Sequence, residues 1–131
     1  MVHYRRSQTH HALKKYSEAQ EDFAEALKRE PDYPNLLNSW AWQLATCPEP
    51  KYRDGRKALD YASRANEKAG GKRPECLDTL AAAYAEAGQF DEAVKAQKKA
   101  IESLAPKAAE QRKAMQARLK LYEAGKPFRT E

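Results

Sequence analysis

One glycine in an alanine-rich stretch constrains the fold of this chain more than any other feature. Residues 77–100 read LDTLAAAYAEAGQFDEAVKAQKKA, and Gly88 separates two segments of helical periodicity. Apolar or small residues recur at three- and four-residue intervals on both sides, as at Leu77, Leu80 and Tyr84 before the glycine. Small side chains on such stripes let helices approach closely. The stretch therefore predicts two packed helices joined at Gly88.

This pattern resembles the tetratricopeptide repeat, a unit of about 34 residues built from two helices. The family's Leu-small pair, tyrosine, turn glycine and two alanines correspond to Leu80–Ala81, Tyr84, Gly88, Ala93 and Ala100. The resemblance implies an all-α fold, a right-handed superhelix or α-solenoid. It also implies a protein-binding role, because the first helices of such repeats line a concave groove.

The chain of 131 residues has room for three such units and one more helix. We expect a single domain over 1–131, with repeats at about 2–33, 34–73 and 74–106 and a capping helix at 107–124. This arrangement has seven helices. Repeat arrays need a terminal helix with a polar outer face, and the capping helix fits that role.

The first unit matches the family better in its second helix than in its first. The second helix carries the family's Ala, Phe, Ala and Pro at Ala19, Phe23, Ala26 and Pro31. Upstream, Lys14 stands where the turn glycine usually lies, and Ser17 with Gln20 has the spacing of a capping box. The first helix has no preceding repeat to cover it. Either this end is frayed, or a partner or second copy covers it, or the chain comes from a longer array.

The second unit is stretched by its central loop. From Ser7 to Ala41, the equivalent small positions, is 34 residues, but from Ala41 to Ala81 is 40. Most of the extra length lies at 47–53, where two prolines interrupt helical structure. This segment resembles a variant repeat of bacterial tetratricopeptide proteins that reads LATCPxPxxRDG. We interpret the loop as a structural elaboration, with a recognition loop as the alternative.

The net positive charge of the chain lies mainly at its C-terminal end. The net charge is +5, and the residues from 105 onward contribute seven basic and three acidic side chains. This basic end is interpreted as a solvated outer face, with contact to nucleic acid as the less favoured alternative.

Cys47 and Cys76 are expected at opposite ends of neighbouring helices, roughly 15 Å apart, which is too far for a disulfide. Without an apolar leader or membrane span, the chain is expected to be cytoplasmic.

No residue pattern points to catalysis or to a cofactor. His3, His10 and His11 lack further ligands nearby, so surface histidines are favoured over a metal site. The glycines mark turns and helix ends, and no phosphate-binding loop is present. We therefore predict a protein that is not an enzyme and holds no cofactor or metal.

Registration of the repeats predicts which side chains face the concave groove. They are Tyr4, Arg5, Gln8, His11, Asn35, Asn38, Ser39, Trp42, Thr46, Glu75, Asp78, Thr79 and Glu86. Trp42 lies roughly 200° around its helix from the core residue Trp40. An aromatic side chain there would anchor a peptide, and the alternative is that Trp42 packs between helices.

The best-known peptide site of this family, the carboxylate clamp of heat-shock co-chaperones, is not expected here. Its five positions register to Tyr4, Gln8, Ser39, Glu75 and Thr79, and none matches. Glu75 places negative charge where that clamp needs positive charge.

We therefore predict a non-catalytic module that binds a protein segment or helix in its groove, favouring some positive charge. The alternative is a self-associating scaffold unit, a homo-oligomer, formed through the first helix or the 47–53 loop. Contact of nucleic acid with the basic helix is a weaker alternative, and membrane association is not expected.

Overall fold

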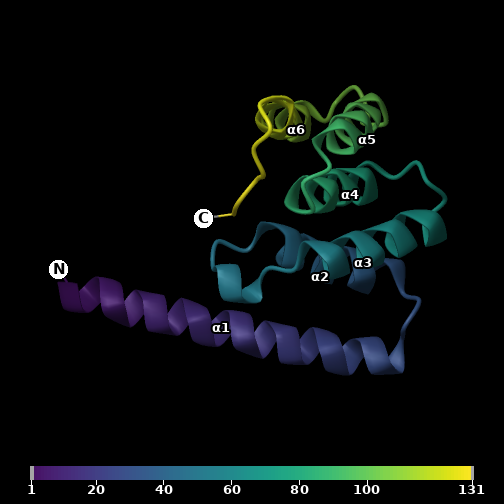
Figure 1. Ribbon diagram of the computed structural model, residues 1–131. Coiled ribbons are helices and arrows are strands. Elements are labelled where there is room, and N and C mark those ends of the chain that lie inside the picture. Colours follow the sequence, from purple (N-terminus) through teal and green to yellow (C-terminus); the bar gives the residue numbers. More distant parts are fainter. Residues whose placement is uncertain (1, 131) are drawn as a thin grey trace.

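A computed structural model describes the backbone of residues 2–130 and the side chains of residues 14–130. The described chain is all-α, with six α-helices and one short 3-10 turn, arranged as a stack (Figure 1). In order they are α1 (Val2–Arg29), α2 (Pro34–Thr46), η1 (Pro50–Tyr52), α3 (Gly55–Lys68), α4 (Pro74–Glu86), α5 (Phe90–Glu102) and α6 (Ala109–Glu123). Successive helices of the stack pack on one another, and α2 also packs on α4.

The predicted pair of helices around Gly88 is α4 and α5. Gly88 has φ +81°, a left-handed conformation that costs glycine little. The N–H of Gln89 donates to the carbonyl of Tyr84 at 2.8 Å, and the N–H of Gly88 donates to that of Ala85 at 3.1 Å. These bonds satisfy carbonyls at the end of α4 and reverse the chain for α5.

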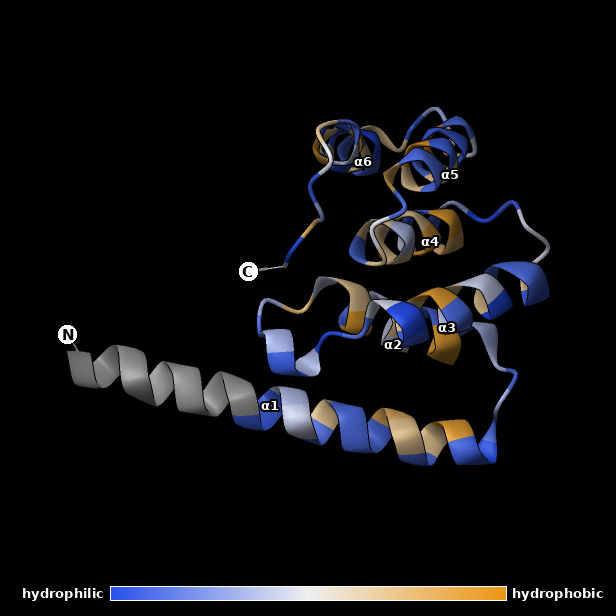
Figure 2. Ribbon diagram, in the orientation of Figure 1, coloured by the Kyte–Doolittle hydropathy of each residue, from blue (hydrophilic) through white to orange (hydrophobic). Residues whose placement is uncertain are grey.

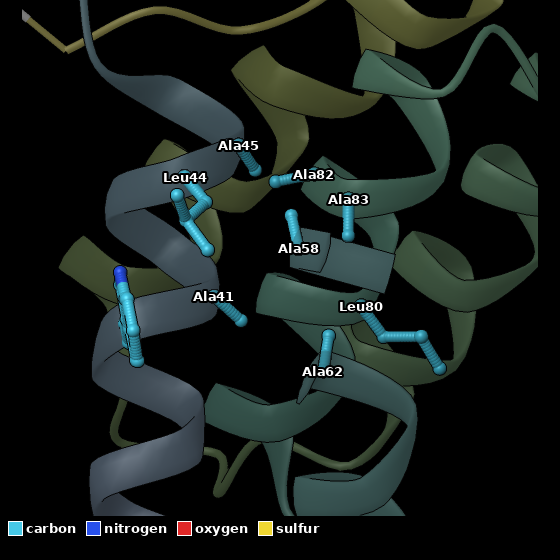
Figure 3. Packing of buried hydrophobic residues seen from close by; sticks show 9 residues of the cluster. Ala41, Leu44, Ala45, Ala58, Ala62, Leu80, Ala82 and Ala83 are labelled. Carbon is cyan, nitrogen blue, oxygen red and sulfur yellow. The ribbon is translucent and has the colours of Figure 1, made fainter. Parts of the chain in front are cut away.

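Alanine packing between α2, α3 and α4 forms the largest part of the core. In Figure 3 Ala41 and Ala45 of α2 lie near Ala58 of α3 and Ala82 of α4. The stacked rings of Phe23, Trp40 and Tyr61 close one side of this cluster. Figure 2 shows hydrophobic residues gathered on α4, with hydrophilic residues over much of α5 and of the coloured part of α1. Small side chains therefore allow a dense core in a polar chain.

The Arg-Asp-Gly sequence before α3 fixes the end of the 47–53 loop. Asp54 caps α3 by accepting the N–H of Lys57 at 3.1 Å. Gly55 lies so close to the end of α4 that a Cβ would meet the Glu86 carbonyl at 3.1 Å. Arg53 donates to the carbonyl of Cys47 at 2.9 Å and lies 3.4 Å from Glu86. These three residues thus hold the loop against α2 and α4.

The first unit differs from the prediction, because α1 is one continuous helix of 28 residues and not a helical hairpin. The count of seven helices is therefore wrong by one. Residues 2–29 contain neither glycine nor proline, and Lys14 replaces the residue that would turn the chain. Lysine is a good helix former, so the helix continues through the expected turn, and Ser17 lies inside it.

The capping helix forms close to its predicted bounds, and Gln97 is adapted to it. Met115 and Tyr122 are buried on its inner face. Gln97 of α5 is fully buried, and its amide donates to the carbonyl of Met115 at 2.9 Å. The side chain of Gln97 therefore links α5 to the backbone of α6.

Candidate interaction surface

Two adjoining hollows open where α1, α2 and α4 meet. The α1–α2 hollow has a volume of about 560 Å³, and the α2–α4 hollow has about 420 Å³. The first is lined by residues that include Asp22, Glu25, Glu30, Tyr33, Asn35 and Leu36. The second is lined by residues that include Asn38, Trp42, Gln43, Glu75, Asp78 and Thr79. Phe23 and Ser39 line both hollows, so the two form one continuous surface.

The lining of this surface is more acidic than basic. Its acids are Asp22, Glu25, Glu30, Glu75 and Asp78, and Arg29 is the basic residue in the lining of the two hollows. The Glu75 carboxylate lies 2.8 Å from Arg73. The backbone N–H of Glu75, and to a smaller extent Arg73, lower the pKa of this carboxyl despite its partial burial. Glu75 therefore stays charged, and the lining of the two hollows carries more negative than positive charge.

Asp78 is the exception, because Arg118 of α6 already pairs with it. Arg118 donates to both carboxylate oxygens of Asp78, at 3.0 and 2.9 Å, in a bidentate ion pair. The two side chains are only 15% and 11% exposed. The pair links α4 to the capping helix and leaves Asp78 little capacity for a ligand.

Trp42 is shared between the core and the α2–α4 hollow. It packs, half-buried, against the core cluster and lines the α2–α4 hollow. The guanidinium of Arg118 lies 5.4 Å from its ring centroid, and the ring of Phe128 lies 5.7 Å away. One part of the indole is thus covered by the C-terminal end of the chain, while another part lines open space.

Of the other predicted groove residues with described side chains, some line the two hollows and others do not. Asn35 is in the α1–α2 hollow, and Ser39 is shared by both hollows. Thr79 is buried, and its hydroxyl donates to the carbonyl of Glu75 at 3.0 Å. Thr46 and Glu86 lie beyond the hollows, where they contact Thr130 and Arg129. The side chains of Tyr4, Arg5, Gln8 and His11 lie outside the described residues.

Several surface residues were not predicted from the sequence. Phe23, Asp22 and Glu25 were assigned to the second helix of a hairpin and not to the groove, and they line the α1–α2 hollow. The missing turn glycine near Lys14 was the available signal. The contacts of Phe128 and Arg129 had no signal, because an extended segment after a capping helix has no periodicity to interpret.

Elsewhere among the described side chains, the two cysteine thiols are buried and no cluster of metal ligands occurs. Cys47 and Cys76 are free and buried, and burial raises the pKa of both thiols, which disfavours the nucleophilic thiolate. No group of three or more metal-ligating side chains occurs among the residues with described side chains. His3, His10 and His11 lie outside that set. Within residues 2–130 no helix combines the length and apolarity of a membrane span.

Comparison with models of protein families shows to which family the chain is related. Residues 1–33 match a family model described as a tetratricopeptide repeat, and residues 75–104 match a second model of the same description. The chain is a tetratricopeptide repeat protein. Searches among curated proteins and among solved structures gave no match.

The two matches cover parts of the chain that follow the repeat structure to different degrees. The first covers α1, whose sequence fits the repeat although its helix runs straight. The second covers α4 and α5, which form the helical pair. Tetratricopeptide repeats are in general protein–protein interaction modules without catalysis. In this tetratricopeptide repeat protein, the face formed by α1, α2 and α4 carries the two adjoining hollows.

Proposed function

We propose that this protein binds an extended segment or helix of another protein on the face formed by α1, α2 and α4, without catalysis. The continuous surface of the two hollows supports this most directly, because it combines an aromatic base with an acidic lining. The ligand contributes basic side chains and at least one apolar side chain. Carboxylates within reach of Phe23 and Trp42 favour that combination over an acidic C-terminus.

The proposed contacts divide by role. Phe23, Tyr33 and Trp42 supply apolar area, and Asp22, Glu25 and Glu75 attract positive charge. Asn35, Asn38 and Ser39 supply polar partners for a ligand backbone. Tyr4, Arg5, Gln8 and His11 were assigned to the groove on the assumption of a helical hairpin, which the continuous helix α1 does not form, so they are left out of these contacts.

A peptide-array screen with the full-length protein tests this function. We expect enrichment of sequences that contain lysine or arginine together with aromatic or large aliphatic residues. For the best sequence, the double variant Asp22→Lys/Glu25→Lys should bind about tenfold more weakly, equivalent to about 1.4 kcal/mol. Binding should also weaken as salt concentration rises.

A matched control separates this surface from general charge effects. Glu67→Lys/Glu102→Lys introduces the same change in charge on α3 and α5, at exposed positions away from the hollows. This control should bind like the wild type. Enrichment of acidic sequences, or equal losses in both variants, would contradict the proposal.

Self-association is a second candidate function, and the straight course of α1 favours it. In a repeat hairpin the first helix covers the second, whereas here residues 14–29 of α1 include no fully buried side chain. A second copy carries the same uncovered helix, so two copies can pack α1 against α1 in a symmetric contact. Light scattering over a hundredfold range of concentration tests this candidate, and a constant monomer mass would exclude it.

A further inference from the structure

The chain's own C-terminal segment, residues 126–130, lies against the ends of α2 and α4 as an extended ligand would. It follows α6 through the turn at Gly125 and runs past α4 toward the end of α2 (Figure 1). Residues 127–130 are all partly buried. The segment has no regular secondary structure, so its position depends on side-chain and end contacts.

Phe128 and Arg129 make the two side-chain contacts that define this position. The ring of Phe128 lies 5.7 Å from that of Trp42, and the Arg118 guanidinium lies 5.2 Å from the Phe128 centroid. Arg129 Nη1 lies 2.6 Å from Glu86 Oε2. The Glu86 side chain is only 16% exposed, which strengthens its attraction for the guanidinium.

Thr130 adds a contact of the kind that peptide ligands make through their backbone. Its N–H donates to the carbonyl of Thr46 at 2.8 Å, and its hydroxyl donates to the same oxygen at 3.1 Å. Thr46 is the last residue of α2, where helix carbonyls lack partners within the helix. The segment therefore supplies an aromatic ring, a guanidinium and a backbone donor in succession.

The three receiving residues are ones that repeat registration assigns to the ligand groove. Trp42, Thr46 and Glu86 were assigned to it from the sequence without reference to the C-terminal segment. One short stretch of chain places an aromatic ring beside Trp42, a guanidinium beside Glu86 and a backbone N–H on the carbonyl of Thr46. This coincidence indicates a subsite for a particular side-chain pattern more than a general surface contact.

We propose that Trp42, Thr46 and Glu86 form a binding subsite for an extended segment in which an aromatic residue is followed by arginine. Phe128 and Arg129 fill this subsite as an internal ligand, and a partner segment of the same chemistry displaces them. The proposal rests on the proposed function, because the subsite continues the face formed by α1, α2 and α4. It adds a specific sequence pattern for the ligand, and it makes access to the subsite depend on displacement of the C-terminal segment.

The connection between α6 and the segment makes the internal ligand an effective competitor. A short tether of this kind gives an effective concentration on the order of 1 mM. A free peptide whose own Kd for the open subsite is about 0.1 mM would then bind the intact protein about tenfold more weakly. Release of the segment should therefore be visible as a gain in peptide affinity.

The experiment measures binding of a fluorescent peptide of sequence GKPFRTE, which copies residues 125–131. The full-length variant Phe128→Ala/Arg129→Ala should bind it about tenfold more tightly than the wild type. Thr130→Pro, which removes the donated N–H, is a milder release variant and should give a smaller gain. Circular dichroism confirms that each variant is folded.

Two controls identify the subsite. Glu86→Gln added to the release variant should abolish the gain, and a peptide with alanine at the phenylalanine and arginine positions should not bind. Lack of binding to both release variants, or equal binding to the wild type, would overturn the inference. If basic peptides still bind at Asp22 and Glu25 in that case, the proposed function survives, and if they do not, both fail.

Discussion

At the scale of single residues, Tyr122 is the largest fully buried side chain among residues 14–130. It is 1% exposed, and it packs with Ala81, Ala85 and Ala93 on the inner side of α6. Burial raises the pKa of its hydroxyl, and the nearby Asp78 carboxylate raises it further, while Arg118 opposes them. The folded protein therefore holds this phenol in its neutral form beyond the pH at which an exposed tyrosine ionises.

This shift predicts a loss of stability at alkaline pH that depends on one hydroxyl. Because the folded-state pKa is raised, the contribution is fully present below about pH 10, the ordinary value for tyrosine. Above it the unfolded chain loses a proton that the folded protein retains, so stability falls by about 1.4 kcal/mol per pH unit. Tyr122→Phe should lack this component in urea unfolding between about pH 9 and about pH 11. The same pH slope in both proteins would contradict this assignment.

At the scale of elements, the long helix α1 is the largest departure from a repeat. Gln20 donates to the carbonyl of Tyr52 at 3.1 Å, and Phe23 stacks on Trp40 at 5.9 Å. The second half of α1 therefore still occupies the place of a repeat's second helix. Only the turn that would return the first half onto it is missing.

A proline at Glu18 distinguishes the continuous helix from a hairpin. If Ser17 capped a second helix, Glu18 would be its first residue, where proline is well tolerated. Inside α1, Glu18→Pro removes a helix hydrogen bond and clashes with the preceding turn, at a cost of about 3 kcal/mol. We expect lower helicity by circular dichroism and an earlier urea midpoint, with Glu18→Ala near neutral as the control. Unchanged helicity in the proline variant would support the hairpin.

The elements differ in how far their sequence determines them, and the reasons are physical. Helices α2 to α6 were predictable because prolines begin α2 and α4, Gly88 ends α4, and alanines recur with helical spacing. The hairpin prediction failed because it followed the family pattern past Lys14, where the residue needed for a turn is absent. The α2–α4 hollow followed from registration, since helical position determines the facing side chains. The contact of Thr130 with Thr46 spans 84 residues, and no local pattern encodes it.

At the scale of the whole molecule, stability is expected to vary along the stack. In repeat arrays each unit is stabilised mainly by its neighbours, so a terminal helix with one neighbour opens most readily. Helix α4 packs on α2, α3 and α5 and has nine buried residues. Between residues 14 and 29, α1 has no fully buried side chain and packs mainly on α2. The chain thus has its firmest part at α4 and its loosest described helix at α1.

Native-state hydrogen exchange measures this gradient directly. Amides in the second half of α1 should exchange at least about tenfold faster than those of α4, because local opening of α1 exposes little apolar surface. If a second copy covers α1, its protection should rise with protein concentration, since binding stabilises only the covered state. Protection of α1 equal to that of α4 at every concentration would contradict the gradient. Protection that appears only at high concentration would favour self-association, so dilution separates a loosely held terminal helix from an interface.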